Sequence, residues 1–134
     1  GRLHHADAVR RIDEVLALNP QAKVFALCFG SNDWDPVAFR RDLLAVVDRV
    51  RAAGRIPVVP RIPFRSDAKE DFAARLNAAV DAVTAERGLL PGPDLYAWFA
   101  AHPERLADGL HPDDAGAVEM IRLWAEAVAP LYPR

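Results

Sequence analysis

An apolar run in residues 23–30, KVFALCFG, constrains the fold of this 134-residue chain more than any other feature of the sequence. Six consecutive apolar residues, from Val24 to Phe29, lie between a lysine and a glycine. A run of this length suits a β-strand, and unbroken apolar character is typical of a parallel strand that is buried on both faces. We therefore expect a strand here, inside a parallel sheet that carries helices on both sides.

Segments with helical periodicity surround this strand. Asp35 and Pro36 suit the N-cap and the first residue of one helix, and Gly54 suits its end. Ser66 or Asp67 suits the N-cap of the next helix. Apolar residues recur at helical spacing in four segments, which are residues 9–16, 39–50, 72–83 and 120–128.

Two further segments indicate short strands. Val58 and Val59 lie in an apolar segment limited by prolines and predict one strand, and Leu95 and Tyr96 predict another. The order of helices and strands is that of an α/β sheet with helices on both faces. Three strands are few for such a sheet. The sequence therefore predicts a single domain over residues 1–134 that is the later part of a larger α/β domain, incomplete at its N-terminal side.

Composition narrows the classes of partner. A formal net charge of −2 gives no electrostatic reason to expect nucleic acid or an anionic membrane surface. No run of about 18 apolar residues predicts a membrane span. Cys28, the only cysteine, lies in the apolar run, and we expect it to be buried and inert. His4, His5 and His102 have no partners at metal-ligand spacing, so we expect no metal ion.

Polar segments lie where ligands bind in open α/β sheets, beyond the carboxyl ends of the strands. They are GSND at residues 30–33, RIPFRSD at residues 61–67 and DGLH at residues 108–111. Gly30 lets the backbone turn sharply, and Asn32 offers a neutral amide donor to a developing oxyanion. The alternative is that Asn32 only tolerates an unusual loop conformation. Trp34 is a candidate ring for stacking on a sugar, and Arg61 and Arg65 are either substrate contacts or solvated loop residues.

Asp108 and His111 form a candidate acid–base pair. A carboxylate on one ring nitrogen fixes the tautomer and stabilises the imidazolium, and the other nitrogen is then available to accept a proton. Gly109 permits a tight turn between the two residues. In the alternative interpretation, Asp108 or Asp113 caps the last helix and His111 is an ordinary surface residue.

Together, Gly-x-Asn-Asp at residues 30–33 and Asp-x-x-His at residues 108–111 resemble the third and fifth sequence blocks of the SGNH (GDSL-type) hydrolase superfamily. The resemblance covers nearly the whole chain. It implies a flavodoxin-like three-layer αβα sandwich with a parallel sheet, and a serine esterase or acylhydrolase that needs no cofactor. It also implies that Asn32 is an oxyanion donor, that His111 is the general base and that Asp108 orients it. A small acyl ester, such as an acetyl group on a carbohydrate, is the substrate that the family suggests.

The sequence departs from this family at the nucleophile. The family's first block, Gly-Asp-Ser, is absent, and the only serines and threonine are Ser31, Ser66 and Thr84, none of which suits that role. Gly1 falls near the position of the second block's glycine, a further oxyanion donor. We therefore expect a Ser-His-Asp triad whose serine lies outside this chain. The chain alone would be inactive, and would pair with the missing N-terminal part of the domain or with another copy of itself. The alternative is a non-catalytic ligand-binding or interaction module derived from the hydrolase fold.

Overall fold

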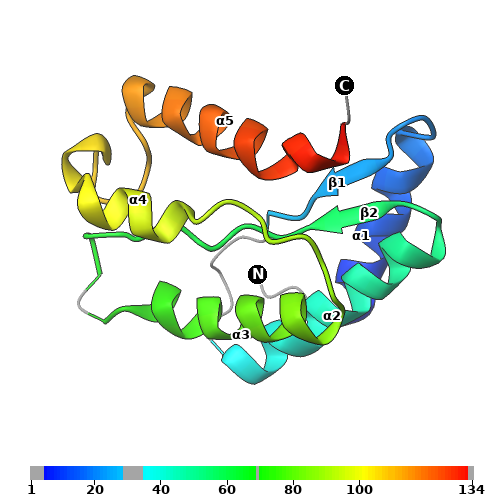
Figure 1. The fold of residues 1–134 in the computed structure, drawn as a ribbon. Helices are drawn as coiled ribbons and strands as arrows, with labels where there is room; N and C mark the ends of the chain where they lie inside the picture. Colours follow the sequence, from blue (N-terminus) through cyan, green and yellow to red (C-terminus); the bar gives the residue numbers. More distant parts are fainter. Residues whose placement is uncertain (1–4, 29–34, 69, 133–134) are drawn as a thin grey trace.

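The computed structural model describes residues 5–28, 35–68 and 70–132 of the chain, shown in Figure 1. Five α-helices and two β-strands lie in these residues, together with two short 3-10 turns at Pro103–Arg105 (η1) and Ala129–Leu131 (η2). In chain order the elements are α1 (His5–Leu18), β1 (Val24–Ala26), α2 (Pro36–Ala52), β2 (Ile56–Val58), α3 (Phe72–Glu86), α4 (Leu95–Ala101) and α5 (Asp114–Val128).

The two strands form a parallel sheet, with Val24 opposite Ile56. An isolated parallel bridge also joins Arg61 to Asp94. Figure 1 shows α5 on one side of the two strands and α2 and α3 on the opposite side. The predicted α/β class with a parallel sheet and flanking helices is therefore confirmed. None of the helices in the described residues is both long and apolar enough to cross a membrane.

Local capping determines where α2 begins and ends, as the sequence predicts. The Asp35 carboxylate accepts a hydrogen bond from the N–H of Val37 at 3.0 Å, and Pro36 occupies the first turn. Gly54 follows the helix with φ of +77° and donates its N–H to the carbonyl of Arg51 at 2.9 Å. The inward face of α2 is buried along its length, and its residues are Phe39, Asp42, Leu43, Val46, Val47 and Val50.

One hydrophobic core joins α1, α2 and α3 to one face of β1. Phe25 and Leu27 are buried in this core, whereas Ala26 and Cys28 are exposed. The prediction that the apolar run is buried on both faces is therefore wrong for its described residues. Helices α1 to α3 cover one face, and on the opposite side α5 leaves Ala26 and Cys28 exposed. Cys28 is exposed rather than buried, although apolar neighbours partly desolvate its thiol and so raise the pKa of Cys28.

Two boundaries differ from those predicted by the sequence. Helix α3 begins at Phe72, because Asp71 caps it by accepting the N–H of Ala74 at 3.1 Å; Ser66 and Asp67 are not its N-cap. The expected strand at Leu95 and Tyr96 is instead the start of α4.

The cause of the second difference is the local chemistry around Asp94. Its carboxylate accepts the N–H of Ala97 at 3.0 Å and so starts a helix. Pro91 and Pro93, immediately before it, have no N–H to donate to a strand ladder. Only the isolated bridge between Arg61 and Asp94 remains of the expected third strand.

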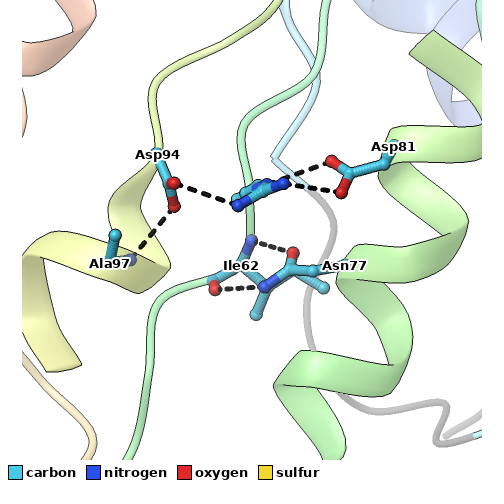
Figure 2. Close-up of polar contacts among 6 residues, drawn as sticks. Ile62, Asn77, Asp81, Asp94 and Ala97 are labelled. Atoms are coloured by element: carbon cyan, nitrogen blue, oxygen red, sulfur yellow. Dashed lines mark hydrogen bonds and ion pairs between the residues drawn. The ribbon is translucent and has the colours of Figure 1, made fainter. Parts of the chain in front are cut away.

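The segment that follows β2 is fastened to α3 and α4, as Figure 2 shows. Asn77, whose surface is 6% exposed, accepts the N–H of Ile62 at 2.6 Å and donates to its carbonyl at 2.9 Å. The guanidinium of Arg61 makes two hydrogen bonds to Asp81, at 3.0 and 2.6 Å, and a third to Asp94 at 3.0 Å. Arg61 therefore has a structural role in the fold. These contacts fix the direction in which residues 63–68 leave the sheet.

Candidate active site

Asp108 and His111 contact each other directly. One carboxylate oxygen, Oδ2, lies 2.7 Å from His111 Nδ1. The other oxygen, Oδ1, accepts the backbone N–H groups of His111 at 2.6 Å and of Leu110 at 2.9 Å. One carboxylate therefore both closes the turn and orients the imidazole ring.

The backbone of residues 105–113 holds this turn in place. Gly109 has φ of +81°, a conformation that side-chain-bearing residues rarely adopt. The N–H of Ala107 donates to the carbonyl of His111 at 2.8 Å, and the N–H of Asp113 donates to the carbonyl of Arg105 at 2.7 Å. Asp113, not Asp108, caps α5, because its carboxylate accepts the N–H of Gly116 at 2.7 Å. The carboxylate of Asp108 is thus committed to the turn and to His111.

Electrostatics keep Asp108 ionised. The backbone N–H of His111, then the side chain of His111, then the N–H of Leu110 all hold the pKa of Asp108 well below its usual range. A carboxylate can only accept hydrogen bonds, so Nδ1 of His111 carries the proton in the neutral ring. Nε2 is then an acceptor, and the side chain of His111 is 72% exposed, so an incoming group can reach it. This arrangement suits a general base.

The predicted meeting of two polar segments is observed. The backbone N–H of Ser66, in the segment after β2, donates to the carbonyl of Gly109 at 2.7 Å. Arg65 and Asp67 on either side of Ser66 form a two-bond ion pair, with both distances 2.6 Å. The sequence predicts that the segments lie at the same edge of the sheet, but not that Arg65 and Asp67 form a pair. The only indication of the pair in the sequence is that a basic and an acidic residue flank Ser66.

Of the serine and threonine residues that the structure describes, neither Ser66 nor Thr84 makes a hydrogen bond to His111. Ser66 contacts the turn through its backbone, and Thr84 lies within α3, near its C-terminal end. Of the other predicted site residues, Gly1, Gly30, Asn32 and Trp34 lie outside the described residues, as does Ser31. Their roles stay predictions.

Within residues 5–28, 35–68 and 70–132, no three His, Cys, Asp or Glu side chains come together in a way that would hold a metal ion. His102 stacks on Trp98 with ring centroids 4.3 Å apart, and its Nδ1 lies 2.9 Å from the Trp98 carbonyl. These contacts give His102 a local structural role at the end of α4.

Comparison with known proteins identifies the relatives of this chain. The model of the GDSL-like lipase/acylhydrolase family matches residues 2–118. A comparison with curated proteins found no match. Among solved structures, TesA superposes with a TM-score of 0.79 at 19% identity, over 96% of this chain and 73% of its own.

Two esterases are also similar. Axe2, an acetyl xylan esterase from Geobacillus stearothermophilus, superposes with a TM-score of 0.71 at 16% identity, over 90% of this chain and 67% of its own. AlinE4, an SGNH-hydrolase family esterase, superposes with a TM-score of 0.61 at 19% identity, over 98% of this chain and 72% of its own. These likenesses are consistent with part of a flavodoxin-like fold.

Proposed function

Because this chain belongs to the GDSL-like lipase/acylhydrolase family, we propose that it carries the general base and the orienting acid of a serine esterase. The family match also confirms the predicted resemblance, and it supports hydrolase function for the intact protein. The observation that carries the finer proposal is the 2.7 Å contact between Asp108 Oδ2 and His111 Nδ1, with Nε2 of the same ring left as an exposed acceptor.

In the proposed reaction a serine hydroxyl attacks the carbonyl carbon of an ester. Nε2 of His111 takes the hydroxyl proton as the new carbon–oxygen bond forms, and Asp108 stabilises the resulting imidazolium. Asn32 donates to the oxyanion, in the role that the family resemblance assigns to it. The imidazolium then protonates the leaving alcohol as the ester bond breaks. Water, deprotonated by the same ring, releases the acid and regenerates the serine.

The serine in this proposal lies outside residues 1–134. Ser66 donates its backbone N–H to the turn and makes no hydrogen bond to His111 among the described residues, and Thr84 lies in α3. Ser31 occupies the variable position of the Gly-x-Asn-Asp block. We call the protein that includes the serine-bearing segment the parent protein.

The proposed substrate is a small acyl ester, with acetyl groups on a carbohydrate as the leading class. The support is the family description, lipase/acylhydrolase, together with the likeness to Axe2, which is an acetyl xylan esterase. Trp34, beside the Gly-x-Asn-Asp block, is the ring that we propose for stacking against a sugar.

We also propose that a further part of the domain, outside residues 1–134, covers the exposed side of this chain. Val118 and Ile121 on α5 are 66% and 71% exposed, and Ala26 and Cys28 on one face of the β1 segment are accessible. TesA is longer than the region that this chain matches, since the match covers 73% of it. Light scattering after size exclusion should show that residues 1–134 alone self-associate. A folded 14.8 kDa monomer would contradict the proposal.

Hydrolysis of p-nitrophenyl acetate tests the esterase assignment. The parent protein should turn the ester over, and the His111→Ala parent should not. Residues 1–134 alone should match the background of an unrelated protein. A parent protein that binds acetylated oligosaccharides without hydrolysing any ester would favour the non-catalytic alternative. Turnover by residues 1–134 alone would show that the nucleophile lies within them.

A further inference from the structure

The loop of residues 65–67 lies directly against the turn that holds Asp108 and His111. Besides the 2.7 Å hydrogen bond from Ser66 N–H to the Gly109 carbonyl, the two backbones approach closely. A Cβ atom on Gly109 would lie 3.1 Å from the backbone nitrogen of Asp67 and 3.0 Å from Oγ of Ser66. The loop and the turn therefore touch without a gap, although some forty residues separate them in the sequence.

The loop brings a guanidinium and a carboxylate to this contact. Arg65 binds Asp67 through Nε–Oδ1 and Nη2–Oδ2 contacts, both 2.6 Å. Their side chains are 17% and 29% exposed, whereas those of Arg87 and Asp48, which form a similar two-bond pair elsewhere, are 30% and 52% exposed. Because water screens these two charges less than it screens a fully exposed pair, removing either charge should have a larger electrostatic effect on nearby groups.

The charge of Asp108 reaches both members of the pair. The pKa of Arg65 is raised, chiefly by its hydrogen bonds to Asp67 and further by the charges of Asp67 and Asp108. The pKa of Asp67 is lowered, chiefly by its hydrogen bonds from Arg65, and the charge of Asp108 opposes that shift. These shifts agree with the geometry, in which the backbone of Asp67 and Ser66 lies against Gly109, the residue after Asp108.

We propose that Arg65 and Asp67 are positioning residues for the acid–base pair: Asp67 holds the guanidinium of Arg65, so that the Asp108 carboxylate stays on His111. The importance of this arrangement for catalysis rests on the proposed function, in which His111 is the general base. A guanidinium beside a carboxylate competes with the imidazole for its oxygens, and an Arg–carboxylate pair is favoured geometrically. Pairing with Asp67 satisfies two of the donors of Arg65 and offsets its positive charge beside the turn.

Other charged groups adjoin the turn from η1 and from the start of α5. Arg105 and Asp113 form their own ion pair at 3.3 Å, and Asp114 lies in the first turn of the helix. The opposite charges of Arg105 and Asp113 offset each other beside α5. This pair therefore does not replace the pair of Arg65 and Asp67, which lies in the loop of residues 65–67.

The test is an NMR titration of the His111 ring in the full-length protein. In Asp67→Asn the guanidinium loses the carboxylate charge that opposes it, so its positive charge acts more strongly on the turn and competes with His111 for Asp108. The titration midpoint of His111 should then move down by about 0.3–0.5 pH unit, the size of one unit charge acting through mostly aqueous surroundings. In Arg65→Gln the carboxylate of Asp67 is unbalanced, so the midpoint should move up by about the same amount.

Matched controls separate charge balance from a loss of structure. The double variant R65Q/D67N removes both charges and should restore the wild-type midpoint, as should Asp67→Glu, which retains the charge. Asp48→Asn and Arg87→Gln break the comparable pair between α2 and the end of α3 and should leave His111 unchanged.

Opposite shifts in the two single variants support the proposal, and equal or absent shifts overturn it. Should a single variant not fold, the double variant and Asp67→Glu decide, because a displaced midpoint in both would overturn the proposal. The titration needs no substrate. A parent protein without esterase activity would therefore refute the proposed function, and the inference about Arg65 and Asp67 would be judged separately.

Discussion

Oδ2 of Asp108 lies 2.7 Å from Nδ1 of His111, while Oδ1 of the same carboxylate accepts the backbone N–H of His111 at 2.6 Å. The two interactions use different oxygens of one side chain. A substitution that keeps an acceptor at Oδ1 therefore preserves the turn while changing what the imidazole meets. This property allows the role of Asp108 in catalysis to be separated from its role in folding.

Asp108→Asn in the parent protein should lower kcat about 10³–10⁴-fold with little change in KM or stability. The amide oxygen can still accept the backbone N–H groups, but an amide NH₂ facing Nδ1 selects the tautomer that cannot accept a proton at Nε2. Ester hydrolysis and thermal unfolding measure the two effects. The control is Asp114→Asn, at the first residue of α5, which should keep wild-type kcat. A kcat near wild type in Asp108→Asn would contradict the role of Asp108.

Asp108 should stay ionised over the whole acid side of the pH–rate profile. The pKa of Asp108 is depressed, so its stabilising contacts are fully present above the ordinary carboxyl pKa of about 4 and are lost only as pH falls through the lower folded value. Between about pH 8 and pH 5, then, Asp108 should not change its charge. A plot of log(kcat/KM) against pH should have a limiting slope of one. A slope of two would mean that Asp108 is protonated in the same range.

Gly109→Ala should destabilise the protein by about 1–2 kcal/mol, because φ is +81° and the new Cβ would meet the backbone of Asp67 at 3.1 Å. Gly54→Ala is the matched control, since Gly54 has φ of +77° but no atom within 4 Å of its Cβ position. Chemical denaturation gives the stabilities, and NMR shifts of His111 give the local effect. Only Gly109→Ala should move the His111 signals. Equal effects of both variants on His111 would contradict the close approach of the loop.

Asn77→Ala should cost about 2–3 kcal/mol of unfolding free energy, because it leaves the N–H and the carbonyl of Ile62 without their side-chain partner. Asn19→Ala removes an exposed side chain that makes one hydrogen bond, to the carbonyl of Val15 at 2.9 Å, and should cost less than about 0.5 kcal/mol. Urea unfolding compares the two. Similar costs would show that Asn77 does not fasten the segment after β2.

Local signals in the sequence predicted the helices well, and the same kind of signal explains where prediction was wrong. At Asp35–Pro36 a single good N-cap precedes the periodic segment, and the structure begins α2 there. Before α3 the predicted N-cap is Ser66 or Asp67, whereas the structure uses Asp71. Local preference does not separate these three. In the structure the backbone N–H of Ser66 donates to the carbonyl of Gly109, so Ser66 belongs to the loop beside the turn and not to the start of α3. Helix propensity contains no information about this long-range contact.

In the candidate site, too, local contacts could be predicted from the sequence and long-range contacts could not. Asp108 and His111 are three residues apart, so their contact follows from local spacing and a glycine between them. The approach of Arg65 and Asp67 depends on how the segment after β2 leaves the sheet, which Asn77 and its neighbours in Figure 2 determine. Periodicity carries no information about that direction. Likewise, burial of Cys28 was expected from its apolar neighbours in sequence, whereas exposure depends on which elements cover the strand.

The central claim is that His111 and Asp108 serve a serine that lies outside residues 1–134. Labelling the parent protein with a fluorophosphonate, followed by peptide mapping, tests it most directly, because this reagent bonds covalently to a serine activated by a general base. We predict one labelled serine, located outside residues 1–134, and loss of labelling in His111→Ala. Label on Ser31 or Ser66, or unchanged labelling in His111→Ala, would contradict the account.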